Sequence, residues 1–237
     1  MTQVVTIRHD GLVPNEVRQS PFHIVGGGGV GSHVVQLLAR MQLGLLGVTV
    51  YDGDIVEAHN PPSQQFTGEH IGQHKVQALC AQARIWSDDQ IPFFPVAEMV
   101  TKQIACKGIV ILCLDSMQSR RDIMRQSLFN NPDVSLVIET RMDATFACVY
   151  LLDPNNTSHQ ACWESTWYSD EDAENKTGCN GHYAIPTATS MTANLAVQQM
   201  LNYFGPEGET STPNVLMLNL VHWRTTTRLW PKELLTE

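Results

Sequence analysis

Short apolar runs alternate along the first half of the chain with longer segments in which apolar residues recur at every third or fourth position. Each run predicts a buried strand, and the runs occupy residues 22–25, 48–51, 91–96 and 109–114. The periodic segments predict helices over residues 32–41, 68–86 and 117–129. Strands that alternate with helices are typical of an α/β protein. We therefore expect a Rossmann-like, doubly wound sheet that is mostly parallel.

The second half of the chain predicts a different strand arrangement. Two apolar segments, 134–139 and 146–152, are joined by only a few residues, which favours antiparallel pairing. Residues 153–180 lack periodicity, and a connection of this length is usually functional or mobile. The pattern then predicts a helix over 186–204 and one or two closing strands within 214–229, broken near Trp223. We therefore expect antiparallel strands to join the sheet in the C-terminal half.

The same pattern predicts one domain over residues 1–237. Residues 1–20 form a lead-in, either an arm or a hairpin. Residues 21–133 form the first half, with the parallel strands. Residues 134–237 form the antiparallel extension, a crossover loop and the closing strands.

Composition and charge exclude several classes of protein. Hydrophobic residues make up 43% of the 237 residues, which is enough for a substantial core. The formal net charge of −9 argues against a chain that mainly holds nucleic acid. No apolar run is long enough for a membrane span, and the N-terminus lacks a signal-peptide pattern, so we expect no membrane partner. Six scattered cysteines fit a reduced, cytoplasmic setting: Cys80, Cys106, Cys113, Cys148, Cys162 and Cys179.

A glycine-rich turn follows the first predicted strand and opens the first long helix. Gly26, Gly28 and Gly31 occupy the positions of a G-x-G-x-x-G motif, and Asp52 stands at the end of the second strand. Such glycines let the backbone approach a phosphate, which the N-terminus of the helix favours electrostatically. The carboxylate can accept hydrogen bonds from ribose hydroxyls. The turn therefore predicts a nucleotide site and makes residues 21–133 the nucleotide-binding half, whereas the alternative is a turn that serves only close helix–sheet packing.

Three further features lie where ligands bind in such a sheet. Residues 55–66 contain two adjacent prolines, which exclude a helix and indicate a rigid loop after the second strand, the alternative being a solvated connection. Lys75 lies early in the next helix, where an isolated lysine is usually only a solvated charge. Asp115 ends a central strand, and its carboxylate suits a metal–phosphate complex. The alternative for Asp115-Ser116 is a helix cap, and the two roles are compatible.

Taken in order, these features resemble one family over roughly residues 20–204. The resemblance is carried by residues 25–32, by Asp52-Gly-Asp54 with Glu57, by Asn60, by 64–66, by 71–76, by 114–116 with Arg120 and Arg121, and by Cys179 before a small-residue helix. This order and spacing are similar to those of the ubiquitin-activating superfamily, including the ThiF- and MoeB-like adenylyltransferases. Short, single-domain members of bacterial or phage type also occur in this superfamily.

The resemblance implies a function. It implies that ATP binds at the glycine turn and that the C-terminal carboxylate of a ubiquitin-like or sulfur-carrier protein, or of a short peptide, attacks the α-phosphate. In that pattern Asp52 holds the ribose, Asn60 and Lys75 contact phosphates, and Asp115 holds Mg²⁺. Gly29, Asp54 and Gln64 complete the nucleotide-binding set that the resemblance implies. It also implies a homodimer, to which the helix 186–204 would contribute.

The sequence departs from the family pattern at three points. The family usually has an arginine where this chain has Ser63, so Arg120, Arg121, Arg141 or a second subunit would have to supply the catalytic cation. Two C-x-x-C pairs for zinc are missing, and we predict no zinc. The length leaves no room for a separate catalytic-cysteine or ubiquitin-fold domain.

Cys179 is the predicted nucleophile. In related enzymes a cysteine at this point forms a thioester or persulfide with the activated substrate, and a helix N-terminus beside it would favour the thiolate. Cys162 is the fallback, and the alternative is an ordinary loop cysteine.

Two other functions remain compatible with the sequence. A dehydrogenase that uses NAD would need the same glycine turn and Asp52, although Lys75 and Asp115 suit a triphosphate with Mg²⁺ better. A catalytically reduced binding subunit of a heterodimer is suggested by Ser63 in place of arginine.

Overall fold

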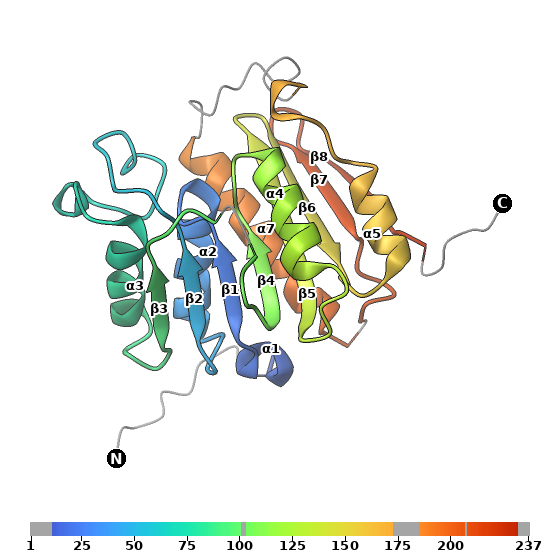
Figure 1. Ribbon diagram of the computed structural model, residues 1–237, viewed down its shortest axis with the longest axis horizontal. Coiled ribbons are helices and arrows are strands. Elements are labelled where there is room, and N and C mark those ends of the chain that lie inside the picture. Colours follow the sequence, from blue (N-terminus) through green and yellow to red (C-terminus); the bar gives the residue numbers. More distant parts are fainter. Residues whose placement is uncertain (1–10, 101–102, 173–184, 207, 232–237) are drawn as a thin grey trace.

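A mixed sheet of eight strands runs through the molecule in the order β3-β2-β1-β4-β5-β6-β7-β8 (Figure 1). The structure is a computed structural model that describes residues 11–100, 103–172, 185–206 and 208–231. The first five strands in this order are parallel, and β6, β7 and β8 join them as an antiparallel set. The strands are β1 (Phe22–Val25), β2 (Val48–Tyr51), β3 (Phe93–Val96), β4 (Gly108–Leu112), β5 (Val134–Asp143), β6 (Phe146–Leu152), β7 (Val215–Asn219) and β8 (Arg224–Arg228). The predicted fold class is confirmed.

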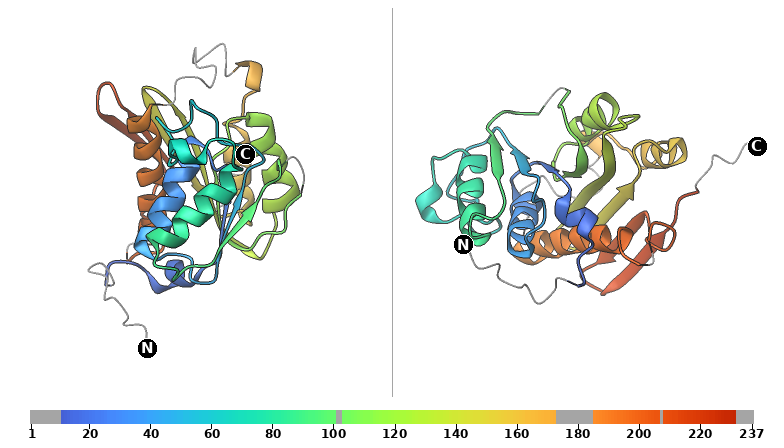
Figure 2. Two further views of the ribbon diagram at one scale, coloured as in Figure 1. Left: turned by 90° about the vertical axis from the view of Figure 1, so that its left-hand side faces the viewer. Right: turned by 90° about the horizontal axis from the view of Figure 1, so that it is seen from below.

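Helices cover both faces of the sheet (Figure 2). One face is covered by α2, α3 and α7, and the other by α4, the π-helical turn η2 and α5. The helices are α1 (Asn15–Gln19), α2 (Gly29–Met41), η1 (Gly68–His70), α3 (Lys75–Trp86), α4 (Met117–Ile123), η2 (Met124–Leu128), α5 (Thr157–Glu164) and α7 (Pro186–Tyr203). Because both faces are covered, the central strands are mostly apolar on both sides, and β1 is buried along its whole length.

The chain reverses its direction of travel across the sheet between β1 and β4. From β1 it moves outward through β2 to β3, then returns to place β4 on the other side of β1. The carboxyl ends of β1 and β4 therefore form a topological switch point, where open α/β sheets bind their ligands. The glycine turn follows β1 and Asp115 follows β4, so the sequence places both at this point.

Two predicted elements differ in the structure. The helix predicted over 68–86 is divided into η1 and α3, because Gly72 adopts a φ of 90°, a conformation that ends a right-handed helix. The stretch 153–180, predicted to be irregular, contains α5, which Asn156 caps by accepting from the backbone N–H groups of Ser158 (2.9 Å) and His159 (3.2 Å).

The lead-in segment forms a short helix where the sequence left an arm or a hairpin open. The Arg18 carbonyl in α1 accepts hydrogen bonds from Gly44 N–H (3.1 Å) and Leu45 N–H (2.9 Å). Val17 of the same helix is completely buried. The described part of the lead-in is therefore joined to the body of the molecule.

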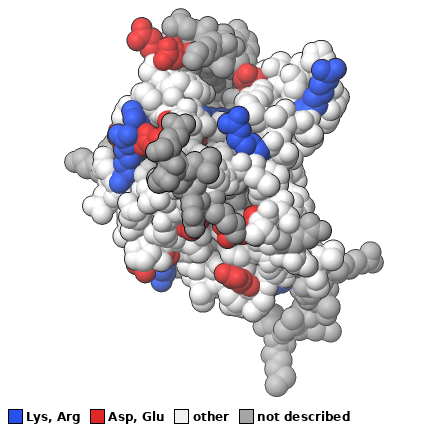
Figure 3. All heavy atoms as spheres, turned by 90° about the vertical axis from the view of Figure 1, so that its right-hand side faces the viewer, with Lys and Arg blue, Asp and Glu red and all other residues white. Residues whose placement is uncertain are grey.

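The β8 edge of the sheet is exposed along its whole length. Figure 3 views the molecule from this side, and the basic and acidic side chains on this face lie in small, separate groups. None of the described helices combines the length and the apolar character that crossing a membrane requires.

A buried histidine links β1 to β2 and to the segment before β4. His23 Nε2 accepts a hydrogen bond from the Lys107 backbone N–H (3.3 Å), so its Nδ1–H is the donor toward the Tyr51 hydroxyl oxygen (2.9 Å). The two rings are stacked, with centroids 5.9 Å apart. Burial, helped by the charge of Lys107, lowers the pKa of His23 to about 4.

This pKa predicts an acid-labile fold. The unfolded chain binds a proton at His23 near pH 6.5 and the folded chain only near pH 4. The stabilisation is therefore complete above pH 6.5 and is lost as the pH falls from 6.5 towards 4. After allowance for partial hydration of the ring, we expect this histidine to account for roughly 2 kcal/mol of the free energy of unfolding.

Denaturant unfolding from pH 7.5 to 4 checks this prediction. His23→Gln should flatten the pH dependence between 6.5 and 4, whereas His222→Gln, at an exposed histidine, should follow wild type. Equal slopes for wild type and His23→Gln would contradict the prediction.

Candidate nucleotide site

A different feature of the structure explains each of the three motif glycines. Gly26 has a φ of +98°, and a Cβ there would lie 2.6 Å from the Cys113 carbonyl oxygen. A Cβ on Gly31 would lie 1.8 Å from the Gly26 carbonyl oxygen, so this glycine lets α2 close onto the turn. A Cβ on Gly28 would meet nothing within 4 Å. Gly28 is therefore the glycine at which the turn leaves open space, and a phosphate can approach its backbone.

Asp52 is fixed against the glycine turn by backbone hydrogen bonds. Its Oδ2 accepts from Gly27 N–H (2.8 Å), and its Oδ1 accepts from Asp54 N–H (2.8 Å). The carboxylate is half-buried, and each oxygen keeps a further acceptor position. The residue predicted to bind ribose thus lies beside the residues predicted to bind phosphate.

Lys75 and Asp54 form an ion pair at the start of α3. The Lys75 Nζ lies 2.7 Å from Asp54 Oδ2, and Lys75 N–H also donates to the Asp54 carbonyl (2.9 Å). The lysine side chain is 10% exposed and the aspartate side chain 56% exposed. Asp54, which is itself open to solvent, thereby holds the Lys75 ammonium near Asp52.

Asn60 is buried and organises the loop that follows β2. Its Oδ1 accepts from Glu57 N–H (2.8 Å), and its carbonyl accepts from Ser63 N–H (3.1 Å) and Gln64 N–H (3.0 Å). Gln64 Oε1 is buried and has no hydrogen-bond partner within the described residues. Ligand contacts by Asn60 and Gln64 stay predictions.

The same loop is tied to two helices by a chain of polar contacts. Thr189 Oγ1 donates to the Ser63 carbonyl (3.2 Å) and lies 3.3 Å from His33 Nε2. His33 Nδ1 contacts Gln65 Nε2 (2.8 Å), and burial lowers the pKa of His33. A Cβ on Gly29 would lie 3.0 Å from Thr189 Cγ2. The N-termini of α2 and α7 and the Ser63 loop therefore meet beside the glycine turn.

A cavity of about 320 Å³ lies against this loop. It is lined by loop residues 61–67, by His33 from α2, by Gln82 and Trp86 from α3, and by Pro186 from α7. Among the predicted site residues that the structure describes, only Gln64 lines it.

Asp115 lies exposed just after β4. Its Oδ1 accepts from Ser116 N–H (2.9 Å), and its Oδ2 has no partner among the described residues. A single carboxylate with a free oxygen suits Mg²⁺, which takes most of its ligands from phosphate and water. The described residues contain no group of three or more His, Cys, Asp or Glu placed to hold a metal. Metal binding by Asp115 stays a prediction.

The three arginines considered as catalytic cations all have partners. Arg120 is 5% exposed, and it pairs with buried Glu139 and donates to the Thr140 carbonyl. Arg141 Nε donates to Glu139 Oε1 (2.8 Å), and its charge and that of Arg120 outweigh burial and lower the pKa of Glu139. Arg121 pairs with Glu164 (3.1 Å). The catalytic role predicted for Arg120 stays a prediction.

The predicted nucleophile, Cys179, lies outside the described residues. Burial raises the pKa of the fallback thiol, Cys162, which lies on α5.

Sequence reasoning missed two groups of residues. One is the contact of His33, Gln65 and Thr189, which joins three segments far apart in sequence. The other is Asp170, whose carboxylate caps α4 next to Asp115. The acidic run that includes Asp170 has the pattern of a solvated loop, so the sequence carried no signal for its contacts.

The fold and the glycine turn are those of the Rossmann-like class. Within it, the chain belongs to the ThiF family, whose sequence model matches residues 2–233. The chain is 27% identical over 215 residues to a ubiquitin-like modifier-activating enzyme 5 from Drosophila mojavensis, covering 82% of this chain and 53% of that protein. The Arabidopsis thaliana protein of that name is 25% identical over 234 residues, with 89% and 54% covered. The chain thus spans about half the length of these relatives.

Solved structures share the fold at low sequence identity. Escherichia coli MccB with ATP matches with a TM-score of 0.69 and 16% identity, covering 96% of this chain and 68% of that one. PaaA matches with a TM-score of 0.66 and 16% identity, with 91% and 74% covered.

The Gly31 contact makes a sharp stability prediction. Gly31→Ala should lower the free energy of unfolding by about 3 kcal/mol, because the new methyl group would overlap the Gly26 carbonyl and neither backbone can move easily. This loss should outweigh the gain of about 1 kcal/mol that alanine brings to a helix. Denaturant unfolding measures the difference.

Gly68→Ala is the matched control. A Cβ at Gly68 would meet nothing within 4 Å, so this variant should stay within about 0.5 kcal/mol of wild type. Equal stability of the two variants would contradict the assigned role of Gly31.

Proposed function

We propose that this protein catalyses ATP- and Mg²⁺-dependent adenylation of a C-terminal carboxylate. The substrate class is a ubiquitin-like or sulfur-carrier protein, or a peptide that ends in a free carboxylate. The observation that carries this proposal is the juxtaposition at the switch point. An open glycine turn stands beside Asp52, with the Lys75–Asp54 pair next to it and Asp115 at the end of the adjacent strand.

Each group fits one part of a bound nucleotide. The phosphates approach the N-terminus of α2 through the open space at Gly28, and Asp52 accepts hydrogen bonds from the ribose hydroxyls. Lys75 is held by Asp54 and supplies a positive charge for the phosphates. A dehydrogenase would need only the glycine turn and Asp52, and Lys75 with Asp115 is what favours a triphosphate.

The reaction moves charge onto phosphate oxygens, and the site's residues act on that charge. The substrate carboxylate oxygen bonds to the α-phosphorus, the bond from that phosphorus to the α,β-bridging oxygen breaks, and pyrophosphate leaves with the electron pair. The backbone N–H groups at the start of α2 and the ammonium of Lys75 stabilise the negative oxygens. Asp115 is the residue that would hold Mg²⁺, which neutralises phosphate charge when bound.

The names of relatives agree with this activity. Two relatives are named as ubiquitin-like modifier-activating enzymes. One structural neighbour is Escherichia coli MccB in complex with AMPCPP and MccA, with a TM-score of 0.71, 16% identity, and 95% of this chain and 68% of that one covered. Because the chain spans only part of the named relatives, their activity is carried over here as a proposal.

The balance of charge supports a second copy of the chain as part of the site. Asp52, Asp54 and Asp115 face the proposed nucleotide with Lys75, while Arg120, Arg121 and Arg141 pair with glutamates. The position where the family usually has arginine is Ser63, whose carbonyl accepts from Thr189. We propose a homodimer whose partner supplies the missing cation. Transfer of the acyl group from AMP to Cys179 Sγ, giving a thioester, would be a second step.

Pyrophosphate release tests the proposal. The protein is incubated with Mg²⁺ATP and a ubiquitin-like sulfur-carrier protein, with that same carrier amidated at its C-terminus, and with a peptide that ends in a free carboxylate. We expect pyrophosphate only with a free carboxylate, because an amide cannot attack phosphorus in this way. Asp115→Asn should lower the rate at least about 10-fold by weakening Mg²⁺ binding.

Two results would go against adenylation. Pyrophosphate release that is equal with the amidated carrier would show that the carboxylate is not the nucleophile. Tight Mg²⁺ATP binding without release in the presence of any of these substrates would favour the catalytically reduced binding subunit.

A further inference from the structure

The start of α4 is capped completely by side chains. The backbone N–H groups of residues 116–119 are the ones that lack partners within a helix, and each has an acceptor here. Ser116 N–H donates to Asp115 Oδ1 (2.9 Å), and Ser119 N–H donates to the Ser116 hydroxyl (3.1 Å). The other two donate to one carboxylate that comes from more than fifty residues further along the chain.

That carboxylate is Asp170. Its Oδ1 accepts from Met117 N–H, and its Oδ2 accepts from Gln118 N–H (3.3 Å) and from the Ser116 hydroxyl (2.9 Å). Asp170 thus receives three donors at the positive end of α4, where a negative charge is favourable. The half-buried position of Asp170 protects these bonds from competition by water.

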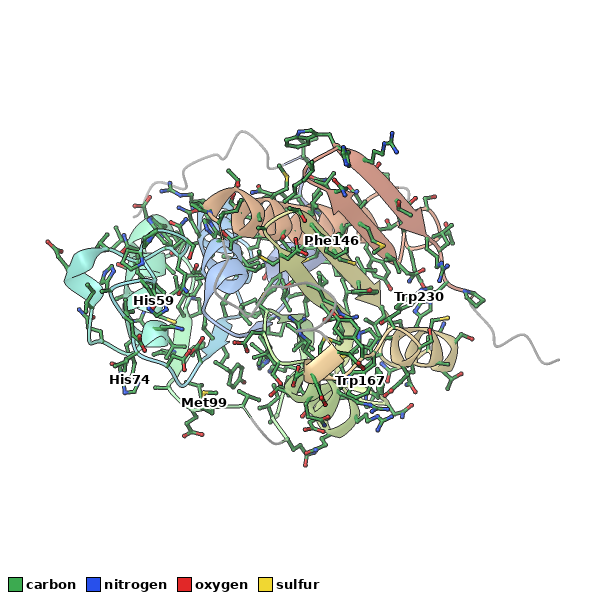
Figure 4. All side chains as sticks on the ribbon, turned by 90° about the horizontal axis from the view of Figure 1, so that it is seen from above. His59, His74, Met99, Phe146, Trp167 and Trp230 are labelled. Atoms are coloured by element: carbon green, nitrogen blue, oxygen red, sulfur yellow. The ribbon has the colours of Figure 1, made fainter. Side chains whose placement is uncertain are left out.

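The segment that carries Asp170 is docked along α4 by further contacts. Trp167 Nε1 donates to the Met117 carbonyl (3.2 Å), and the Arg121 guanidinium lies 4.1 Å from the centre of the Trp167 ring. Glu164 pairs with Arg125 (2.6 Å) and with Arg121 (3.1 Å). Trp167 is labelled in Figure 4, beside the turns of α4. Asp170 is therefore held in place by its own segment and does not depend on the α4 amides alone.

Because Asp170 and the Ser116 hydroxyl accept from most of the donors at the start of α4, Asp115 caps only one of them. Only its Oδ1 is used, by Ser116 N–H, and Oδ2 has no partner among the described residues. If Asp170 were absent, Met117 N–H and Gln118 N–H would lack their acceptor, and Asp115 is the nearest carboxylate in sequence. Asp115 directly precedes the N-cap residue Ser116, and a negative charge is favourable at this end of the helix, so the Asp115 side chain would turn towards these donors.

We propose that Asp170 is a positioning residue for Asp115. It occupies the free N–H groups of α4 and so keeps the Asp115 carboxylate available for the Mg²⁺ of a bound nucleotide. This inference rests on the proposed function, in which Asp115 holds that ion.

The test compares nucleotide affinity with and without the metal. Calorimetric titration measures the Kd for ATP with Mg²⁺ and for ATP with EDTA, on wild type, Asp170→Ala and Asp172→Ala. Asp172 is the matched control, because it lies exposed in the same segment and its removal changes the charge equally. We expect Asp170→Ala to weaken Mg²⁺ATP binding about 10- to 100-fold, the range typical when a residue that orients a metal ligand is lost, and to change metal-free ATP binding less than about 3-fold.

The remaining outcomes are equally decisive. Asp172→Ala should bind both forms like wild type. If Asp170→Ala keeps the metal-dependent gain in affinity, Asp170 serves only the fold and the inference is wrong. If Asp170→Ala does not fold, Asp170→Asn should show a smaller loss confined to Mg²⁺ATP, and an unchanged metal-dependent gain would overturn the inference. If the wild-type protein binds ATP no more tightly with Mg²⁺ than with EDTA, the proposed Mg²⁺-dependent function is wrong, and the inference about Asp170 is wrong with it.

Discussion

The closeness of Gly31 to the Gly26 carbonyl is the constraint on which the candidate site depends. No side chain fits between the start of α2 and the end of β1, because a Cβ on Gly31 would lie 1.8 Å from that oxygen. Gly26 in turn lies against the Cys113 backbone after β4, where a Cβ would lie 2.6 Å from the carbonyl oxygen. These two close approaches therefore hold β1, α2 and the end of β4 together at the switch point, and Gly28, between the two glycines, stays open.

Side chains then secure the loops around this centre. Asp52 accepts a hydrogen bond from Gly27 N–H, so the end of β2 is fixed to the glycine turn. Thr189 donates to the Ser63 carbonyl and contacts His33 in α2, so the start of α7 is held beside the glycine turn. Asp170 binds the start of α4, which carries Asp115. Asp52 and Asp115, which are proposed to contact ribose and metal, thus lie in loops that further polar contacts hold in place.

The sequence predicted the parts of this arrangement that are encoded locally. The spacing of Gly26, Gly28 and Gly31 between a strand and a helix specifies the turn by itself, and the apolar runs specify the central strands. The break at Gly72 was missed because a glycine can adopt either a helical or a positive φ, and the sequence alone does not say which. The contact between His33 and Thr189 joins residues 156 positions apart, and the contact between Met117 and Asp170 joins residues 53 positions apart. Such pairings depend on how the finished layers meet, and a single sequence carries no local sign of them.

The central claim is that the glycine turn serves a triphosphate with Mg²⁺, and thermal unfolding of the wild-type chain with each nucleotide tests it most directly. At about 100 times its Kd, a ligand adds roughly 2.7 kcal/mol to the free energy of unfolding. We predict that Mg²⁺ATP raises the midpoint temperature and that NAD leaves it unchanged. A rise with NAD alone would contradict the claim and would assign the turn and Asp52 to a dinucleotide.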